Sequence, residues 1–250
     1  MLKLLKFEFK RLWKTKALVL LWILCVAIAV MGAVLNNFFY DGIDDSYRKL
    51  LSIFNAYTQF SYLILGFLFV TVFTRDNTNG IVNFYKQIGF SQLSQYTCKT
   101  IMLFLASVPL IAATVIICGI IYQNQDPGFL LTMLIAIIFS MLFIILLALF
   151  VSLILKNTLR SVLVFYGLFV LFNILNLAFY GLTNPADGNS IVTFCMSNWN
   201  GISASHYSLD KIAKDIIVYK KLICCFVPAG WCLLLLLVNM VLIKIKGRDS

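Results

Sequence analysis

The sequence has few charged residues for its length. Only 12% of its 250 residues are charged, whereas 62% are hydrophobic. A soluble domain averages about half apolar and about a quarter charged residues. So few polar side chains could not cover so much apolar surface in water, so lipid is expected to be the solvent for most of the chain. The composition predicts an integral membrane protein.

The residues and motifs of most enzyme active sites are also missing. The chain has one histidine, His206, and no CxxC or Cys/His spacing typical of a zinc site. It has no G-x-x-x-x-G-K-[ST] sequence to hold the phosphates of ATP. An intramembrane enzyme would need a catalytic acid or histidine within its apolar segments, and they contain neither. We therefore predict no catalytic residue, no metal site and no cofactor bound by this chain.

Apolar segments long enough to cross about 30 Å of hydrocarbon are plentiful. Their unalternating runs of Leu, Ile and Phe suit helices rather than barrel strands, so the fold class predicted is an all-α polytopic membrane protein forming one domain. The first apolar run exceeds the length of a signal-peptide core and is expected to be retained. The six predicted spans lie near residues 17–36, 58–74, 100–122, 129–155, 161–182 and 222–243.

Basic residues divide unevenly between the two sides of these spans. Fourteen of the 20 lysines and arginines fall in alternate segments on one side, which predicts that this side and both termini are cytoplasmic. A net charge of +10 spread in this way does not favour a nucleic-acid site, which needs its cations on one face. No Lys, Arg, Asp or Glu lies within a predicted span, so any uphill transport is expected to draw energy from another chain.

Three segments outside the spans are expected to be helical in part. Residues 1–16 predict a basic amphipathic helix in the inner headgroup layer, and Leu2, Leu5, Phe9, Leu12 and Trp13 can share its apolar face. The outer segment 183–221 begins with turn-forming residues and ends in a short amphipathic helix that Ser208 can cap. Cys195 lies in this segment, and a bridge to Cys224 stays open.

The loop at residues 75–99 predicts a further cytoplasmic helix at about residues 78–93. Ile81, Val82, Tyr85 and Ile88 recur at helical spacing and give one apolar face, which must be buried against lipid or a partner. Gly89 interrupts the pattern, and Ser91 can cap a helix that runs into the third span.

Among the polar residues within the predicted spans, four are candidates for contact with cargo: Ser61, Thr71, Asn173 and Asn176. The two asparagines are three residues apart and share a helix face. The four could line a translocation path or hydrogen-bond neighbouring helices, and the sequence leaves both readings open.

The stretch FTRDNTNGIVNFYKQIGFSQLSQYTCK, residues 73–99, resembles the cytoplasmic loop of small ABC-2 type ABC-transporter permeases. In that family an acidic residue and a glycine open a coupling helix, a G-x-S turn follows, and a lysine begins the third span. Gln92 stands where arginine is common. The resemblance extends to the six spans and the amphipathic N-terminus. It implies that the following residues couple to an ATPase: Asp76, Gly80, Ile81, Phe84, Tyr85, Ile88, Gly89, Ser91 and Lys99.

Such permeases work in pairs and use a separate P-loop ATPase dimer, so the resemblance places ATP and Mg²⁺ on a partner subunit. It also implies a location in the cell membrane. The short loops resemble those of the bacteriocin-immunity and bacitracin-type peptide exporters, which expel amphipathic antimicrobial peptides. The alternatives are an exporter of lipids or small hydrophobic drugs and a non-transporting immunity or sensor protein.

Overall fold

The computed structural model describes residues 2–39, 46–122, 127–155, 157–182 and 218–248, and this part of the chain is helical without a strand. The all-α class predicted from composition is confirmed there. The helices are α1 (Leu2–Lys14), α2 (Ala17–Phe39), α3 (Ser46–Thr78), α4 (Ile81–Gln87), α5 (Gln92–Ile121), α6 (Pro127–Ile154), α7 (Thr158–Leu182) and α10 (Val218–Arg248).

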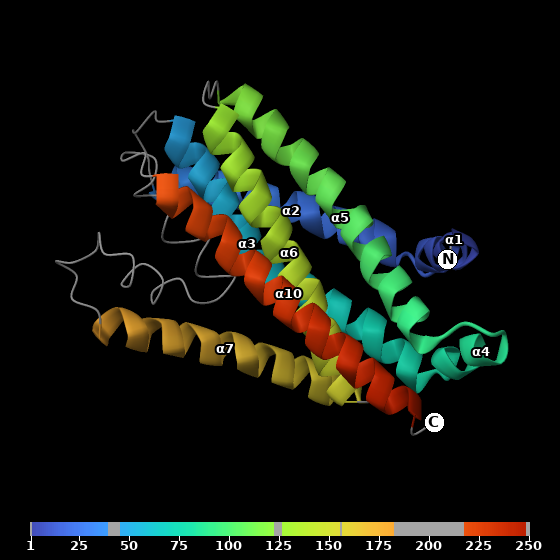
Figure 1. The fold of residues 1–250 in the computed structure, drawn as a ribbon. Coiled ribbons are helices and arrows are strands. Elements are labelled where there is room, and N and C mark those ends of the chain that lie inside the picture. The colour runs from blue at the N-terminus through green and yellow to red at the C-terminus, as the bar shows by residue number, and fades with distance from the viewer. Residues whose placement is uncertain (1, 40–45, 123–126, 156, 183–217, 249–250) are drawn as a thin grey trace.

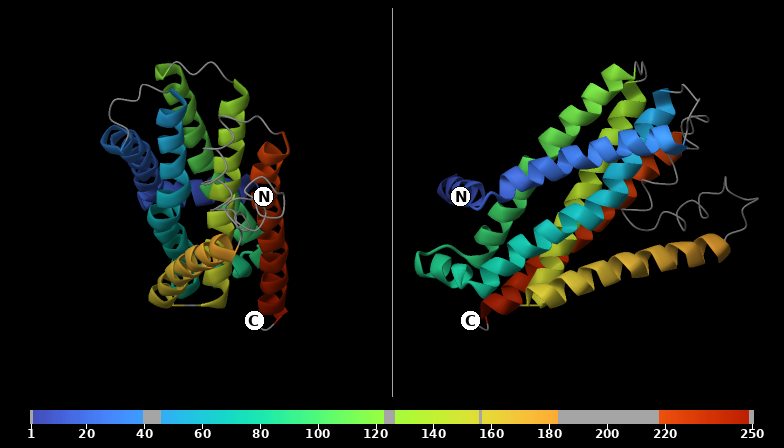
Figure 2. Two further views of the ribbon diagram at one scale, coloured as in Figure 1. Left: turned by 90° about the vertical axis from the view of Figure 1, so that its left-hand side faces the viewer. Right: turned by 180° about the vertical axis from the view of Figure 1, so that it is seen from behind.

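The long helices form a bundle with one divergent member. Helices α2, α3, α5, α6 and α10 pack together, with α3 in contact with α2, α6 and α7 (Figure 1). Helix α7 leaves the bundle at an angle, and its contacts within the described chain are mainly with α3 and α6 (Figure 2). The short helices α1 and α4 lie at one end, and both ends of the described chain lie toward that end (Figure 1).

Three helices of the described chain are long and apolar enough to cross a membrane. They contain the segments Ala17–Val34, Gln92–Ile121 and Met133–Ile154. Two shorter apolar stretches, Thr158–Leu171 and Ala229–Ile245, lie in α7 and α10. Large apolar side chains such as Ile120, Leu163 and Leu233 point outward from these helices, as expected for surfaces in contact with lipid. The count of six spans stays a prediction.

Close contact between α2 and α3 explains why α3 begins well before the predicted span. Leu50, Ile53 and Tyr57 on its first turns are fully buried. A Cβ at Gly32 would lie 2.8 Å from the Ile53 Cα, so the absence of a side chain lets the two backbones approach. The Ser52 hydroxyl donates to the Gly32 carbonyl at 2.7 Å across the same contact.

The predicted cytoplasmic loop is shorter than expected. Helix α3 continues through Asp76 to Thr78, and α5 begins at Gln92, so Asp76 and Lys99 are helical and buried instead of lying in a loop. The helix predicted at residues 78–93 is confined to Ile81–Gln87. The helices extend because Asp76 and Lys99 find oppositely charged partners there, which offsets the cost of burying them.

The amphipathic N-terminal helix is present, and it has an inward face that the sequence analysis did not predict. Leu4, Glu8 and Leu12 are buried, whereas Phe9 and Trp13 are about half exposed. Phe9 and Trp13 stack on each other at 6.2 Å between ring centroids. The face turned toward the bundle therefore carries a carboxylate, and the aromatic face is left for the membrane surface.

Candidate functional site

The ends of α1, α3 and α5 meet in a cluster of four buried or partly buried charges. Arg11 donates from Nη1 and Nη2 to the two carboxylate oxygens of Asp76 at 2.7 and 2.8 Å. Its Nη2 also donates to Glu8 Oε2 at 2.8 Å, and Lys99 Nζ forms an ion pair with Asp76. Two cations and two anions leave the cluster neutral.

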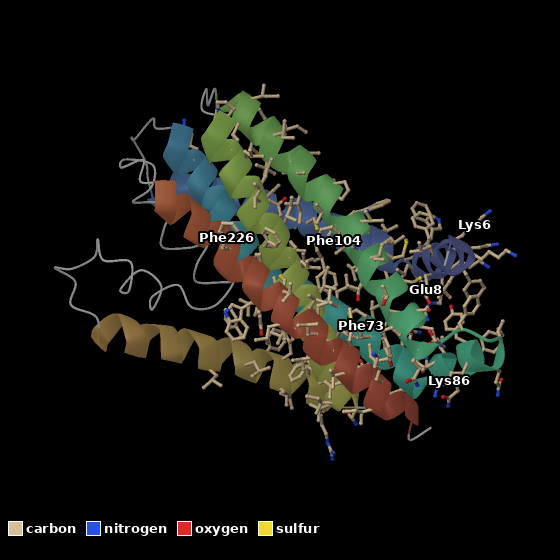
Figure 3. All side chains as sticks on the ribbon, in the orientation of Figure 1. Lys6, Glu8, Phe73, Lys86, Phe104 and Phe226 are labelled. Atoms are coloured by element: carbon tan, nitrogen blue, oxygen red, sulfur yellow. The ribbon has the colours of Figure 1, made fainter. Side chains whose placement is uncertain are left out.

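Burial makes this arrangement specific. The side chains of Glu8, Asp76 and Lys99 are at most 7% exposed, and that of Arg11 is 19% exposed. Removing one partner from a buried ion pair typically costs about 3–5 kcal/mol, because it leaves a charge without compensation. The four groups are therefore held in this one arrangement, which fixes α1 against α3 and α5. Glu8 lies on the side of α1 that faces α4 and α5 (Figure 3).

Helix α4 is bounded by two glycines in the left-handed region. Gly80 has φ 68° before the helix and Gly89 has φ 91° after it. The Gly89 N–H donates to the Lys86 carbonyl and the Phe90 N–H to the Tyr85 carbonyl, both at 2.9 Å, which is the Schellman pattern. The Ser91 hydroxyl then accepts from the Ser94 N–H at 3.2 Å and caps α5. The turn predicted from Gly89 and Ser91 is confirmed.

The inner face of α4 packs on α1 and α5. Tyr85 is buried with Leu4 and Cys98, and its ring meets Phe7 edge-on at 5.9 Å between centroids. Gln95 Nε2 donates to the Phe90 carbonyl at 3.0 Å, which ties the turn after α4 to α5. Val82 and Tyr85, expected to face lipid or a partner, are thus covered by the chain's own helices.

The Tyr85 hydroxyl lies near the charge cluster. It is buried and has no hydrogen-bond partner among the described residues. Burial, and then the nearby Glu8 carboxylate, raise the pKa of the phenol above its usual value, so the hydroxyl stays neutral.

The outer face of α4 is apolar and exposed. Phe84 is 52% exposed and Ile88 is 56% exposed. The exposed glycine turns at Gly80 and Gly89 flank them, with no atom within 4 Å of a Cβ added at either glycine. This outer face, formed by Phe84 and Ile88, is an exposed apolar patch at the end of the molecule where the charge cluster lies.

The comparison with known families agrees with this architecture. A family model described as the peptide export permease protein YydJ family matches residues 5–246. The chain belongs to this family. The match confirms the resemblance to ABC-type peptide exporter permeases, and it includes every residue of the charge cluster and of α4. No curated protein matches the chain.

Of the polar residues predicted to line a path through this YydJ-family permease, the two whose side chains are described, Ser61 and Thr71, do not lie together. Ser61 is fully buried in α3, and its hydroxyl has no partner in the described chain. Thr71 lies about 15 Å further along the helix and donates to the Leu68 carbonyl at 2.8 Å. Asn173 and Asn176 lie in α7, but their side chains are outside the described part, as are Cys195, Ser208 and the rest of residues 183–217.

Glu8 and Arg11 are the site residues of this YydJ-family permease that the sequence analysis missed. Arg11 was interpreted as one of many topology-determining cations. The available signal was Glu8, because it is the single acidic residue in the first 40 positions and it interrupts an otherwise basic helix. An isolated acid three residues before an arginine can form an i,i+3 ion pair, which it does here.

Proposed function

We propose that this chain is the transmembrane subunit of an ABC transporter that exports amphipathic peptides. A separate P-loop ATPase dimer, carrying ATP and Mg²⁺, would dock on α4 and supply the energy. The observation that carries this proposal is the two-sided character of α4. Its outer face, Phe84 and Ile88, is free in the described chain, whereas its inner face is packed on α1 and α5. Family membership supports peptide export.

The contacts of α4 provide a route for force into the bundle. Displacement of α4 would act on α1 through the Tyr85–Phe7 contact and on α5 through the Gln95–Phe90 hydrogen bond. The pairing of Arg11, Asp76 and Lys99 would keep the ends of α1, α3 and α5 together, so that they move as one body. Closely packed elements held by specific contacts transmit displacement because they cannot deform continuously.

A second permease chain completes the proposed transporter, as the family resemblance implies. Helix α7 has outward apolar residues along its described length, including Leu159, Leu163 and Val170. Ser61, Thr71, Asn173 and Asn176 are proposed to contact the peptide during passage. The positive-inside distribution supports an orientation with α1, α4 and both termini in the cytoplasm.

The docking of the ATPase can be tested by affinity purification of the intact chain with the bound ATPase activity as readout. We expect the double variant F84S/I88S to lose at least tenfold of the copurified ATPase. The matched control is F9S, which removes a similarly exposed aromatic ring at the same end of the molecule. Equal recovery in F84S/I88S and wild type would contradict docking on α4. Absence of any ATPase from the wild type after crosslinking would favour a non-transporting immunity or sensor protein.

A further inference from the structure

A cavity of about 560 Å³ opens beside the charge cluster. It is lined by the connection between α1 and α2 and by the end of α3 with the turn into α4. Its polar lining includes Lys16, Arg75 and Asn79, and its apolar lining includes Leu20, Leu68 and Val72. The elements that line the cavity meet at the end of the bundle near α1 and α4 (Figure 2).

The charges around this cavity do not balance. Three cations, Arg11, Lys16 and Arg75, and one acid, Asp76, line it. Arg11 is already paired with Asp76 and Glu8. Lys16 and Arg75 are exposed, and neither has an ion-pair partner within the residues that the structure describes. The cavity therefore presents two uncompensated positive charges, and the amide of Asn79 adds further N–H donors.

The backbone fixes the positions from which these two side chains extend. Lys16 has φ 56°, an uncommon left-handed conformation for a residue other than glycine. It joins two helices that are both anchored, because Leu12 and Leu18 on either side are buried. Its N–H donates to the Trp13 carbonyl, and its carbonyl accepts from the Leu20 N–H. The backbone of Arg75 is also ordered, since the next residue in α3 is the buried Asp76.

From these observations we infer that the cavity binds the phosphate of an anionic phospholipid in the inner leaflet. Lys16 and Arg75 pair with the phosphate, and Asn79 donates a hydrogen bond to it. The glycerol and the start of an acyl chain lie along Leu20, Leu68 and Val72. A zwitterionic headgroup carries its own cation and does not neutralise the excess charge.

The apolar wall distinguishes a lipid from an acidic protein loop. Leu20 belongs to α2, and Leu68 and Val72 belong to α3, so this wall is formed by two long helices of the bundle, of which α2 is long and apolar enough to cross a membrane. A water-soluble loop would pair with the two cations but would leave the wall uncovered. A phospholipid matches both halves of the lining, with charge at one end and hydrocarbon at the other.

The test is lipid retention by the full-length chain in detergent, measured by native mass spectrometry against added phosphatidylglycerol or phosphatidylcholine. We expect K16Q/R75Q to retain at least tenfold less phosphatidylglycerol than wild type, while K16R/R75K stays within threefold. The matched control K10Q/K14Q removes two exposed cations from α1 and is expected to stay within twofold. If K16Q/R75Q does not fold, K16Q and R75Q singly should each lower retention about threefold.

Several results would overturn the inference. Equal losses in K16Q/R75Q and K10Q/K14Q would mean diffuse attraction of lipid to a basic surface. Equal retention of phosphatidylcholine and phosphatidylglycerol by wild type would show that the net positive charge of the cavity does not select the lipid. Complete displacement of the lipid by millimolar inorganic phosphate would assign the cavity to a free anion. Unchanged lipid retention with loss of the copurified ATPase would assign it to an acidic surface of the partner.

Discussion

Arg11 and Asp76, 65 positions apart in the chain, form a bidentate ion pair that joins the N-terminal helix to the end of α3. Two parallel N–H···O bonds fix orientation as well as distance, because the planar guanidinium matches the carboxylate. The pair makes α1 part of the folded bundle and not only a helix resting on lipid.

Loss of the Asp76 charge should destabilise the protein strongly. The variant D76N leaves Arg11 and Lys99 close together with Glu8 as the remaining acid of the cluster, and we expect a cost of about 3–5 kcal/mol. Thermal unfolding in detergent should show a clear fall in Tm. R160Q, which alters an exposed cation on α7, should leave the Tm unchanged. A double-mutant cycle with R11M should give a coupling energy above about 1 kcal/mol, and simple additivity would contradict the pairing.

Substitution of Gly66 should separate α7 from α3. A Cβ at Gly66 would lie 2.3 Å from the Phe165 ring, which stacks on Tyr62 at 4.5 Å between centroids. We expect G66A to lower the Tm and F165L to restore part of the loss. G167A is the matched control in α7, where nothing lies within 4 Å of the new Cβ, so it should be neutral or stabilising by up to about 1 kcal/mol. Similar Tm values for G66A and G167A would contradict this packing.

Tyr85 should tolerate loss of its hydroxyl but not of its ring. The hydroxyl is buried without a partner in the described chain, so Y85F should unfold at the same temperature as wild type or slightly higher. Y85A removes a buried ring against Leu4 and Cys98 and should cost about 3–5 kcal/mol. Guanidinium or thermal unfolding of the two variants distinguishes these effects, and a large loss of stability in Y85F would reveal a hydrogen bond of its hydroxyl.

Replacement of Gly89 should uncouple ATP hydrolysis from peptide export without preventing membrane insertion. G89A forces an alanine into the left-handed region, at a cost of about 1 kcal/mol, although the space around it is open. The turn after α4 should shift, so stimulation of the ATPase by peptide should fall severalfold. G89N, which tolerates this conformation better, should keep more of the stimulation. Equal stimulation of the ATPase by peptide in G89A and wild type would show that the turn after α4 has no role in coupling.

The helices and the turns around α4 could be predicted from the sequence because both depend on local residue types. Long apolar runs indicate helices whatever their neighbours are, and Gly89 followed by Ser91 indicates a helix end and a cap. The lengths of α3 and α5 could not be predicted in the same way. They extend into the expected loop because Asp76 and Lys99 find their partners on other helices, which only the tertiary structure reveals.

The inward face of α1 was missed for a related reason. Periodicity groups Phe9 and Trp13 with Leu12 on the face assigned to the headgroup layer, and it treats Glu8 as polar surface. The actual face is set by Arg11, Asp76 and Lys99, which stabilise the buried Glu8 region electrostatically. The apolar face of α4 was ambiguous between lipid and a partner, and the structure divides it: Tyr85 turns inward, while Phe84 and Ile88 face outward.

The four members of the charge cluster all lie within the first 99 residues. During synthesis they can therefore assemble as soon as the start of α5 has left the ribosome, before α7 and α10 have been made. Proteins made at about 5–20 residues per second give this N-terminal portion several seconds to join α1 to α3 and α5. The later helices are then added to a portion in which these four charges are already paired, so none of the four is left unpaired while the rest of the chain is made.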